Sequence, residues 1–414
     1  MAGAVVWNYA SIVITAVCGM TFNIIIGNAY PENVLGRFNT VYSYYIVLSQ
    51  FSACGIHMAV SKFVAQYCGK MESEDTILNE AVWISFFLSL CVSVLGGVVV
   101  NLCIPEILGE SWLHSMNTIW PALIFFSMNK VILGWLNGCS MMKAYAFFQA
   151  ARNCLIAASL CVFAYGGLQG ELLSVVFFVS ESILFLTAVL YLSGHWRLSF
   201  VWHGNYYRRL VSFGIRILPA NAVLELNTKM DVICLSLILR DEYIVGIYSF
   251  AAMFCEGFYQ LFVVVRKIIN PKITEAWYSG KLTRFIDGLN SRQMKYVYPA
   301  GICSLLLLCA GFYGLLWIMG NTSYLQGMPL IVGTCLFMVI NAKSIVFGNI
   351  LSQTGHPAQE SLVNIMTTVW NGIANVGLIP FLGMYGAALA TGLSYCVFGW
   401  AQKRCVVRRL GIVL

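Results

Sequence analysis

The sequence predicts an all-α polytopic membrane protein with about twelve transmembrane helices, arranged in two six-helix lobes. Of the 414 residues, 59% are hydrophobic and only 10% are charged, whereas charged residues make up about 25% of an ordinary soluble domain. Apolar runs of about 20 residues recur along the chain, and each can cross a hydrocarbon core of ~30 Å as a helix. The basic residues, moreover, gather in alternate connections between these runs.

The apolar runs are separated by short segments that contain Gly, Pro or charged residues, which are typical of turns and loops. The first run begins by Ala4 without preceding basic residues and is too long for the hydrophobic part of a signal peptide, so we expect it to remain as a span. The expected spans are 4–28, 40–66, 78–104, 116–142, 146–166, 171–193, 211–239, 243–268, 296–319, 326–351, 361–381 and 385–404.

The distribution of basic residues predicts the orientation in the membrane. With the N-terminus inside, the outer connections hold only Arg37 and Arg240, next to acidic residues that include Glu106 and Glu171. Both termini are therefore expected in the cytoplasm, because basic residues concentrate in cytoplasmic loops. The residues assigned to the cytoplasmic side are Lys62, Lys70, Lys143, Arg152, Arg197, Arg208, Arg209, Arg266, Lys267, Lys272, Lys281, Arg284, Arg292, Lys295, Lys403, Arg404, Arg408 and Arg409.

The two halves of the chain resemble each other. An offset of 210 aligns Gly36 with Gly246 and Lys62 with Lys272, and an offset of about 212 aligns Asn129 with Asn341. Parallel repeats of this kind are a transporter architecture with the substrate site between the halves. We therefore expect an N-terminal lobe at 1–200 and a C-terminal lobe at 201–414.

Four basic residues lie within apolar spans instead of in loops: Lys130, Arg216, Lys229 and Lys343. A charge at the centre of a membrane helix costs at least about 2.5–3.5 kcal/mol, so it is kept mainly where it faces a cavity or a partner. These residues predict a cationic cavity that binds an anionic cargo. Arg216, near the inner end of its span, could instead extend to the headgroups.

Titratable residues in the spans are candidates for ion coupling or for pairing with these bases: His57, Glu225, Asp231 and Glu256. Glu225 and Lys229 are four residues apart, hence on one face of a helix and able to pair. Glu181 or Glu256 could equally neutralise Lys130 or Lys343. The sequence leaves open which bases remain unpaired, and a lone histidine is more often structural than a proton relay.

Several function classes lack their signatures. Most of the fifteen cysteines lie in or near apolar spans, where cysteine behaves as a small hydrophobe, and no zinc-type spacing occurs. The chain has no P-loop, no H-E-x-x-H and no G-x-S-x-G motif. We therefore expect no metal, no cofactor, no catalytic residue and no nucleic acid partner, since the membrane orientation accounts for the net charge of +7.

Short motifs resemble those of Wzx-type polysaccharide flippases, a branch of the multidrug/oligosaccharidyl-lipid/polysaccharide (MOP) superfamily. They are GRFNTVYSYY at 36–45, VSKFVA at 60–65, NILSQTGH at 349–356 and LGMYGAALAT at 382–391. The resemblance covers nearly the whole chain and implies a flippase (MATE-like) fold of two six-helix lobes.

The resemblance also implies a function. Such proteins move an undecaprenyl-pyrophosphate-linked oligosaccharide from the inner to the outer leaflet of the cell inner membrane, for O-antigen, lipopolysaccharide or another surface polysaccharide. Membrane lipids and a polysaccharide polymerase of the same pathway are the other implied partners. The alternatives are a drug/cation antiporter of the same superfamily, for which an acidic cavity is expected, and a membrane-embedded glycosyl polymerase or ligase, for which a long outer loop is expected.

Overall fold

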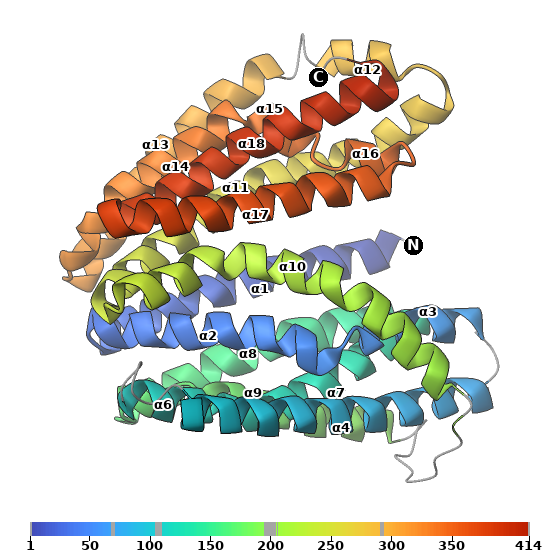
Figure 1. Ribbon diagram of the computed structural model, residues 1–414, viewed down its shortest axis with the longest axis vertical. Helices are drawn as coiled ribbons and strands as arrows, with labels where there is room; N and C mark the ends of the chain where they lie inside the picture. Colours follow the sequence, from blue (N-terminus) through green and yellow to red (C-terminus); the bar gives the residue numbers. More distant parts are fainter. Residues whose placement is uncertain are drawn as a thin grey trace. The chain divides into compact units, whose positions relative to one another are not determined.

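The computed structural model describes residues 2–67, 71–103, 110–193, 204, 206–289 and 294–412, and all regular secondary structure in these ranges is helical. Four of the charged residues on which the predicted orientation depends lie outside the described residues: Lys70, Glu106, Arg197 and Arg292. The chain divides into two compact units, Met1–Leu226 and Asn227–Leu414, and each is described by itself (Figure 1).

The first unit is built around helix α7, which packs against α2, α3, α4, α8 and α9. Helix α1 packs along α8. The helices of this unit are α1 (Ala2–Ala29), α2 (Glu32–Ala53), α3 (Ile56–Gln66), α4 (Met71–Cys103), α6 (Glu110–Asn117), α7 (Ile119–Gly138), α8 (Met142–Tyr165), the 3-10 turn η1 (Gly170–Leu172), α9 (Val175–Leu192) and the first part of α10 (Tyr207–Leu239).

Small residues let α3 and α7 approach closely. A Cβ atom at Gly134 would lie 2.3 Å from the carbonyl oxygen of His57, and one at Gly138 would lie 2.9 Å from the carbonyl oxygen of Ser61. The two glycines are four residues apart on α7 and form a small-xxx-small motif, which in membranes brings helix backbones into contact. This contact fixes the backbone of His57 against the central helix.

The expected span 40–66 is broken in the structure. Cys54 and Gly55 both adopt left-handed conformations, with φ of 44° and 65°, and separate α2 from α3. At the break the chain contacts α10, where a Cβ atom at Gly55 would lie 2.7 Å from the carbonyl oxygen of Gly214. The expected span 40–66 was drawn as continuous, and the break lies where Gly55 packs against a helix about 160 residues later in the chain.

The second unit contains the rest of α10 and the helices that follow. Helix α11 packs against α14, α15 and α16, while α18 packs against α14 and α17. The bounds are α11 (Glu242–Tyr278), α12 (Leu282–Gly288), α13 (Met294–Met319), the 3-10 turn η3 (Ser323–Gly327), α14 (Met328–Ile340), α15 (Ala342–Val346), α16 (Ile350–Gln353), α17 (Pro357–Leu382) and α18 (Met384–Leu410). The expected span 326–351 is therefore a run of short helices.

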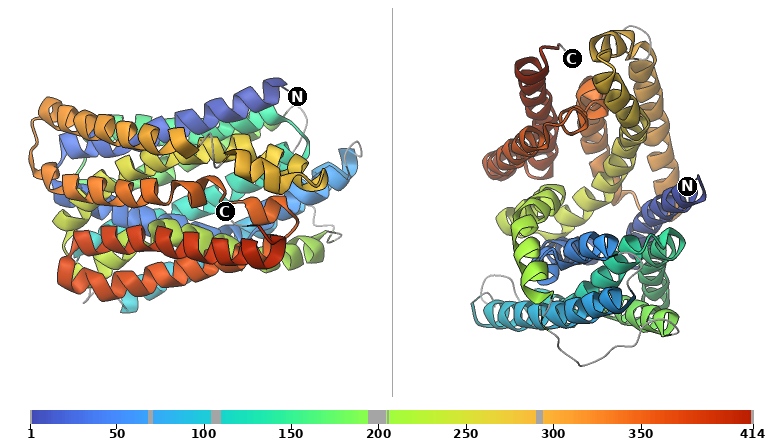
Figure 2. Two further views of the ribbon diagram at one scale, coloured as in Figure 1. Left: turned by 90° about the horizontal axis from the view of Figure 1, so that it is seen from above. Right: turned by 90° about the vertical axis from the view of Figure 1, so that its right-hand side faces the viewer.

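Each of the twelve expected spans coincides with one helix or with consecutive helices. Among the described residues, eight helices are long and apolar enough to cross a membrane by length and composition. Helix α10 is not one of them, and it carries six charged side chains, while the second span is split at Cys54. Within each unit the helices run side by side along a common direction (Figure 2).

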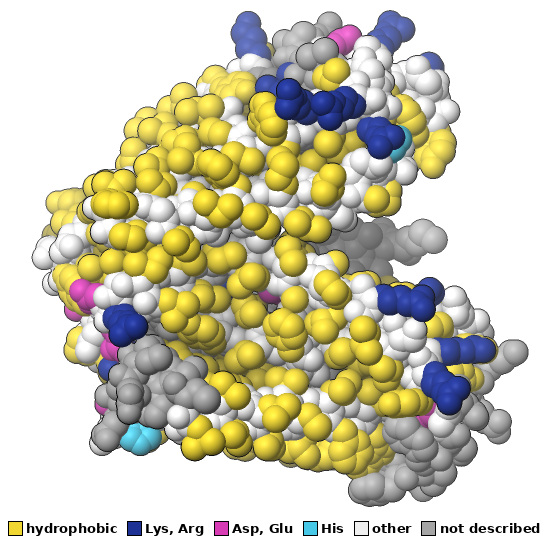
Figure 3. Space-filling model, viewed as in Figure 1, with side chains coloured by type: hydrophobic (Ala, Val, Ile, Leu, Met, Phe, Trp, Pro, Cys, Tyr) yellow, Lys and Arg dark blue, Asp and Glu magenta, His cyan; other side chains and the backbone are white. Residues whose placement is uncertain are grey.

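The surface of each unit matches a membrane-spanning protein. Figure 3 shows Lys and Arg side chains toward the ends of the helices of each unit, with mainly apolar side chains on the helices between them. Apolar side chains are stable in contact with hydrocarbon, whereas basic side chains extend toward headgroups and water. The chain is a multi-pass membrane protein.

The boundary between the two compact units lies inside α10, after Leu226, and the two lobes expected at 1–200 and 201–414 stay a prediction. The first part of α10 belongs to the first unit because it packs on the break between α2 and α3. Pro219 lies within the same helix, where it removes one backbone hydrogen bond and favours a bend.

Candidate functional site

The first unit contains a buried polar centre around Glu181. This carboxylate on α9 is fully buried, and it forms an ion pair with the guanidinium of Arg152 on α8. It also accepts hydrogen bonds from the Tyr45 hydroxyl (3.2 Å) and from Asn129 Nδ2 (2.8 Å). The ring of Tyr45 stacks on Phe177, with 4.9 Å between centroids. Helices α2, α7, α8 and α9 thus meet at one charged group.

Arg152 was expected on the cytoplasmic side, and the structure corrects this assignment. The residue lies well inside α8, with its side chain only 17% exposed. The guanidinium carbon lies over the ring of Phe126 at 4.5 Å from its centroid, and one terminal nitrogen, Nη2, is buried without a hydrogen-bond partner among the described residues. A fifth base is therefore held within the apolar part of the chain.

Lys130 lies beside this pair. Its ammonium group is 5.3 Å from the centroid of the same Phe126 ring, and it is within electrostatic range of Arg152, Glu181 and Glu225. No carboxylate of the described residues lies within ion-pair distance of Lys130, whereas both oxygens of Glu181 already accept bonds from other groups. Two bases, Lys130 and Arg152, therefore lie near Glu181, and only Arg152 pairs with it directly, while Glu225 is a second carboxylate within electrostatic range of Lys130.

His57 joins the same cluster from α3, and it is within electrostatic range of Lys130. Its Nδ1 atom is buried and has no hydrogen-bond partner in the described part of the chain. Its backbone packs against Gly134, so α7 positions both His57 and Lys130. The proximity of His57 to Lys130 follows from this helix contact, and its role in ion coupling stays a prediction.

The second unit has a different centre, around Asp231 on α10. The carboxylate accepts hydrogen bonds from four neutral donors on three helices: Tyr248 Oη (2.7 Å) on α11, Asn375 Nδ2 (2.8 Å) and Asn371 Nδ2 (3.4 Å) on α17, and Thr391 Oγ1 on α18. No basic side chain of the described residues forms an ion pair with Asp231. The donors fix the carboxylate without neutralising its charge.

The remaining predicted residues have separate environments. Lys229 pairs with Glu256 on α11 at 3.7 Å, although Glu256 is 65% exposed. Lys343 lies on the short helix α15, partly buried and within electrostatic range of Lys403. Arg216 is exposed on α10, and Glu225 is partly buried on the same helix.

The structure therefore brings Lys130 and His57 together in the first unit, and it places Lys229, Asp231 and Glu256 near the start of the second. Sequence reasoning missed Arg152 and the amide and hydroxyl partners of the two carboxylates. One signal was present, since Asn371 and Asn375 are four residues apart in the apolar helix α17 and so lie on one face. Among the described residues, no group of three or more His, Cys, Asp and Glu side chains could hold a metal ion.

Comparison with known proteins identifies the family of this chain. Residues 2–278 match the family model described as "Polysaccharide biosynthesis protein". The chain belongs to the polysaccharide biosynthesis protein family. A relative of this family member, the uncharacterized membrane protein MJ1068 of Methanocaldococcus jannaschii, is 20% identical over 94% of this chain and 81% of its own length.

Solved structures show that this family member has the fold of MOP-superfamily transporters. The lipid II flippase MurJ in an inward closed conformation aligns with a TM-score of 0.78, 13% identity, and coverage of 97% of this chain and 87% of that one. A multidrug resistance MATE family transporter in an inward-facing conformation aligns with a TM-score of 0.73, 13% identity, and 94% coverage of both chains. These likenesses confirm the predicted flippase (MATE-like) fold.

A third similar structure is a MOP superfamily transporter of Pyrococcus furiosus, with a TM-score of 0.60, 11% identity, and coverage of 98% of this chain and 96% of that one. Its description states that the reverse polarity of its binding pocket suggests a different function. The polarity of the pocket therefore differs among proteins that share this fold, so the function of this family member has to be argued from its own charged residues.

Proposed function

We propose that this protein is a flippase that moves a lipid-pyrophosphate-linked oligosaccharide from the inner to the outer leaflet by alternating access. The observation that carries the proposal is the pair of bases around Phe126, where Arg152 takes Glu181 as its ion-pair partner and Lys130 has no carboxylate of the described residues within ion-pair distance. An intramembrane charge without a full counter-charge is costly, so its retention points to a ligand. The ligand that compensates this charge is an anion.

A pyrophosphate suits the two bases in different ways. The planar guanidinium of Arg152 has a buried Nη2 with no hydrogen-bond partner among the residues that the structure describes, and guanidinium groups bind phosphate oxygens with directed hydrogen bonds. The ammonium of Lys130 supplies a point charge beside it. Arg216, Lys229 and Lys343 are further candidates for contacts with the cargo, although Lys229 already has Glu256 as a partner.

The cargo that fits both the charge and the family is an undecaprenyl-pyrophosphate-linked oligosaccharide. Its lipid tail can stay in the bilayer while the pyrophosphate and sugar cross through a polar path, and no covalent step is required. Membership of the polysaccharide biosynthesis protein family supports a glycan cargo. The acidic centre at Asp231 favours one alternative, a drug/cation antiporter. Exchange of a cationic compound against an ion gradient would support that function.

We further propose that Asp231 is the coupling group. A buried carboxylate in an apolar environment is stabilised when a proton or a bound cation neutralises it. Within the described part of the chain, the groups that donate to Asp231 are all neutral, and among them are the amide nitrogens of Asn371 and Asn375. By contrast, Glu256 is exposed and has Lys229 as its counter-charge. Neutralisation of Asp231 by a proton or a monovalent cation is therefore the proposed driving event.

The same proposal places the protein in the inner (cytoplasmic) membrane with both termini in the cytoplasm. The support is the excess of basic residues in connections on that side, among them Lys267, Lys281 and Arg408. The product would pass to a polysaccharide polymerase of the same pathway, for example in the synthesis of O-antigen and lipopolysaccharide. This assignment makes the protein a transporter and not an enzyme.

Lys130→Gln is expected to slow transport of a fluorescent lipid-pyrophosphate oligosaccharide in proteoliposomes at least about tenfold. The reason is the loss of a charge-assisted contact with the pyrophosphate, since hydrogen bonds to charged groups contribute about 1.5–3 kcal/mol. The measurement is leaflet-resolved accessibility of the glycolipid to an external quencher.

Lys143→Gln is the matched control, because Lys143 is an exposed base at the start of α8. It should transport at the wild-type rate. If Lys130→Gln also transports normally, the anion-binding role of Lys130 is wrong. If the wild type moves no anionic glycolipid but does exchange a cationic compound against a proton or Na⁺ gradient, the antiporter is the correct function.

Asp231→Asn is expected to make transport independent of the imposed ion gradient, because asparagine keeps the size of the side chain but cannot be neutralised by a proton and holds a cation more weakly. Proteoliposomes with opposite proton or Na⁺ gradients would show equal rates for this variant and unequal rates for the wild type. Glu256→Gln serves as the control and should retain the dependence. A gradient response that survives in Asp231→Asn and disappears in Glu256→Gln would assign the coupling to Glu256.

A further inference from the structure

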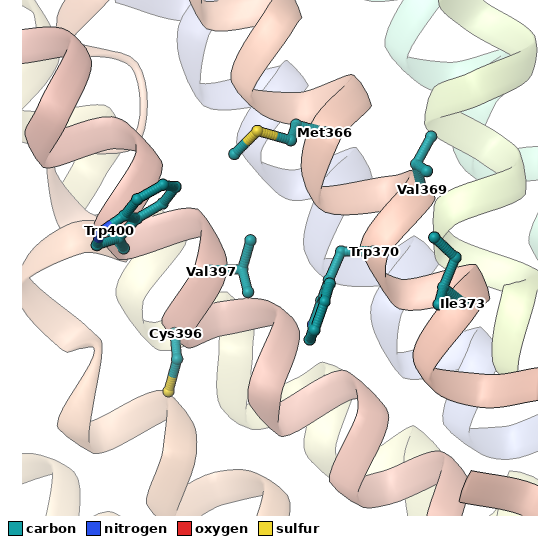
Figure 4. A pocket seen from close by; sticks show the side chains of 7 residues that line it. All are labelled: Met366, Val369, Trp370, Ile373, Cys396, Val397 and Trp400. Carbon is teal, nitrogen blue, oxygen red and sulfur yellow. The ribbon is translucent and has the colours of Figure 1, made fainter. Parts of the chain in front are cut away.

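A groove on the second unit runs between α17 and α18 and contains no group used in the proposed transport. It encloses about 540 Å³, a volume within the range of about 300–1,000 Å³ that small-molecule pockets occupy. Side chains from the two helices line its opposite sides (Figure 4). The lining residues are Met366, Val369, Trp370, Ile373, Cys396, Val397 and Trp400.

The chemistry of the lining excludes a path for sugars or ions. Every lining residue is apolar or aromatic, and Trp400 and Ile373 are more than half exposed although they lie in or near the spans. A polar cargo would leave its hydrogen-bonding groups unsatisfied in such a groove. A hydrocarbon chain, in contrast, has no hydrogen-bonding groups to satisfy in the groove, and it gains van der Waals contact with the aromatic rings.

One end of the groove is basic. The guanidinium carbon of Arg404 lies 4.7 Å from the centroid of the Trp400 ring, one helical turn further along α18. Stacking uses the face of the guanidinium and leaves the N–H groups at its edge available to donate hydrogen bonds. Lys403, Arg408 and Arg409 are exposed on the same part of α18. A ligand with an apolar chain and an anionic head would match this end.

We propose that the groove binds one acyl chain of an anionic phospholipid, whose phosphate contacts Arg404. The length of the groove favours an acyl chain that spans one leaflet of the bilayer. From Cys396 to Arg404 the helix rises about 12 Å at 1.5 Å per residue, slightly less than the ~15 Å of one leaflet of a ~30 Å core. The polyprenyl chain of a glycolipid cargo is several times longer than this groove. The lipid site does not depend on the proposed transport function.

The experiment uses the quenching of tryptophan fluorescence by phospholipids that carry bromine on the acyl chains. The full-length protein is reconstituted in membranes that contain brominated phosphatidylglycerol or brominated phosphatidylcholine at equal mole fraction. The chain has eleven tryptophans, and all of them contribute to the fluorescence. The quenching at the groove is therefore taken as the difference in quenching between the wild type and Trp400→Phe. We expect the anionic lipid to quench this difference signal more strongly.

Arg404→Gln should lower the preference for brominated phosphatidylglycerol about fivefold, which corresponds to the ~1 kcal/mol that one basic residue contributes near an anionic membrane surface. Arg409→Gln is the matched control. It removes the same charge from the same helix, but nine residues from Trp400 it lies on the opposite face, so the preference should remain.

Three results would overturn the proposal. The first is equal quenching by the two lipids in the wild type. The second is an equal loss of preference in Arg404→Gln and Arg409→Gln, which would show a general surface charge effect. The third is relief of the quenching by an equal mole fraction of unbrominated polyprenyl phosphate with no effect of unbrominated phosphatidylglycerol, which would assign the groove to the cargo lipid.

Discussion

Arg152→Ala is expected to lower the free energy of unfolding by about 3–5 kcal/mol, because removing one partner of a buried ion pair leaves the other charge uncompensated. The remaining charge is Glu181, which is fully buried and held by Tyr45 and Asn129. The measurement is an unfolding titration in detergent, followed by tryptophan fluorescence.

The double variant Arg152→Gln/Glu181→Gln separates structure from function. Both side chains keep hydrogen-bonding groups but lose their charges, so most of the stability lost in Arg152→Ala should return. Transport should nevertheless stay slow if Arg152 binds the pyrophosphate through its Nη2 atom. A double variant that folds and transports at the wild-type rate would limit Arg152 to neutralising Glu181. An Arg152→Ala protein as stable as wild type would contradict the ion pair itself.

Gly134→Ala is the second change with a large expected effect. A Cβ atom there would lie 2.3 Å from the carbonyl oxygen of His57 and 3.0 Å from its carbonyl carbon. Backbone atoms of a packed helix cannot move aside as a flexible side chain can, so we expect a loss of about 1–3 kcal/mol, as in overpacked cores. The same unfolding titration checks it.

The control for Gly134→Ala is Gly333→Ala on α14, where a new Cβ atom would have no neighbour within 4 Å. Alanine favours a helix over glycine by about 1 kcal/mol, so this control should be slightly more stable than wild type. The two substitutions are chemically identical and should have opposite signs. If both stabilise the protein, α3 does not pack on α7 as closely as described.

The positions of the membrane helices could be read from the sequence, because apolar length and the positive-inside distribution depend only on the residues in each segment. Interruptions within spans could not be read in the same way. The break at Cys54 lies where Gly55 packs on Gly214, and the breaks that follow Ile340 lie where α15 packs against α11. Such tertiary contacts cannot be read from the composition of one segment.

The sequence pointed to some charged residues of the candidate site, such as Lys130, but not to Arg152 or to the pairing. Glu181 and Glu256 were left open as partners of Lys130 or Lys343, and in the structure they pair with Arg152 and Lys229. Arg152 was assigned to the cytoplasmic side because it lies only a few residues after the start of an apolar run. Which base meets which acid depends on the rotation of each helix about its axis, and small errors in the limits of a span change that rotation.

Tyr45 illustrates the same difficulty for aromatic residues. Three tyrosines near the outer end of the second span are typical of an interfacial belt, yet Tyr45 is fully buried and donates to Glu181. A tyrosine at the interface and a tyrosine that satisfies a buried carboxylate have the same sequence signature. Only the position of α9 beside α2 distinguishes them.

The spacing of two charged residues on α10 has a consequence for how the second unit tolerates insertions and deletions. Lys229 pairs with Glu256, and Asp231 accepts hydrogen bonds from four donors, with one residue between the two on the helix. Adding or deleting a single residue between Lys229 and Asp231 would turn one of them by about 100° about the helix axis relative to the other. Their spacing is therefore constrained by angular phase, whereas a change of length in a connecting loop such as 240–241 leaves that phase unaltered.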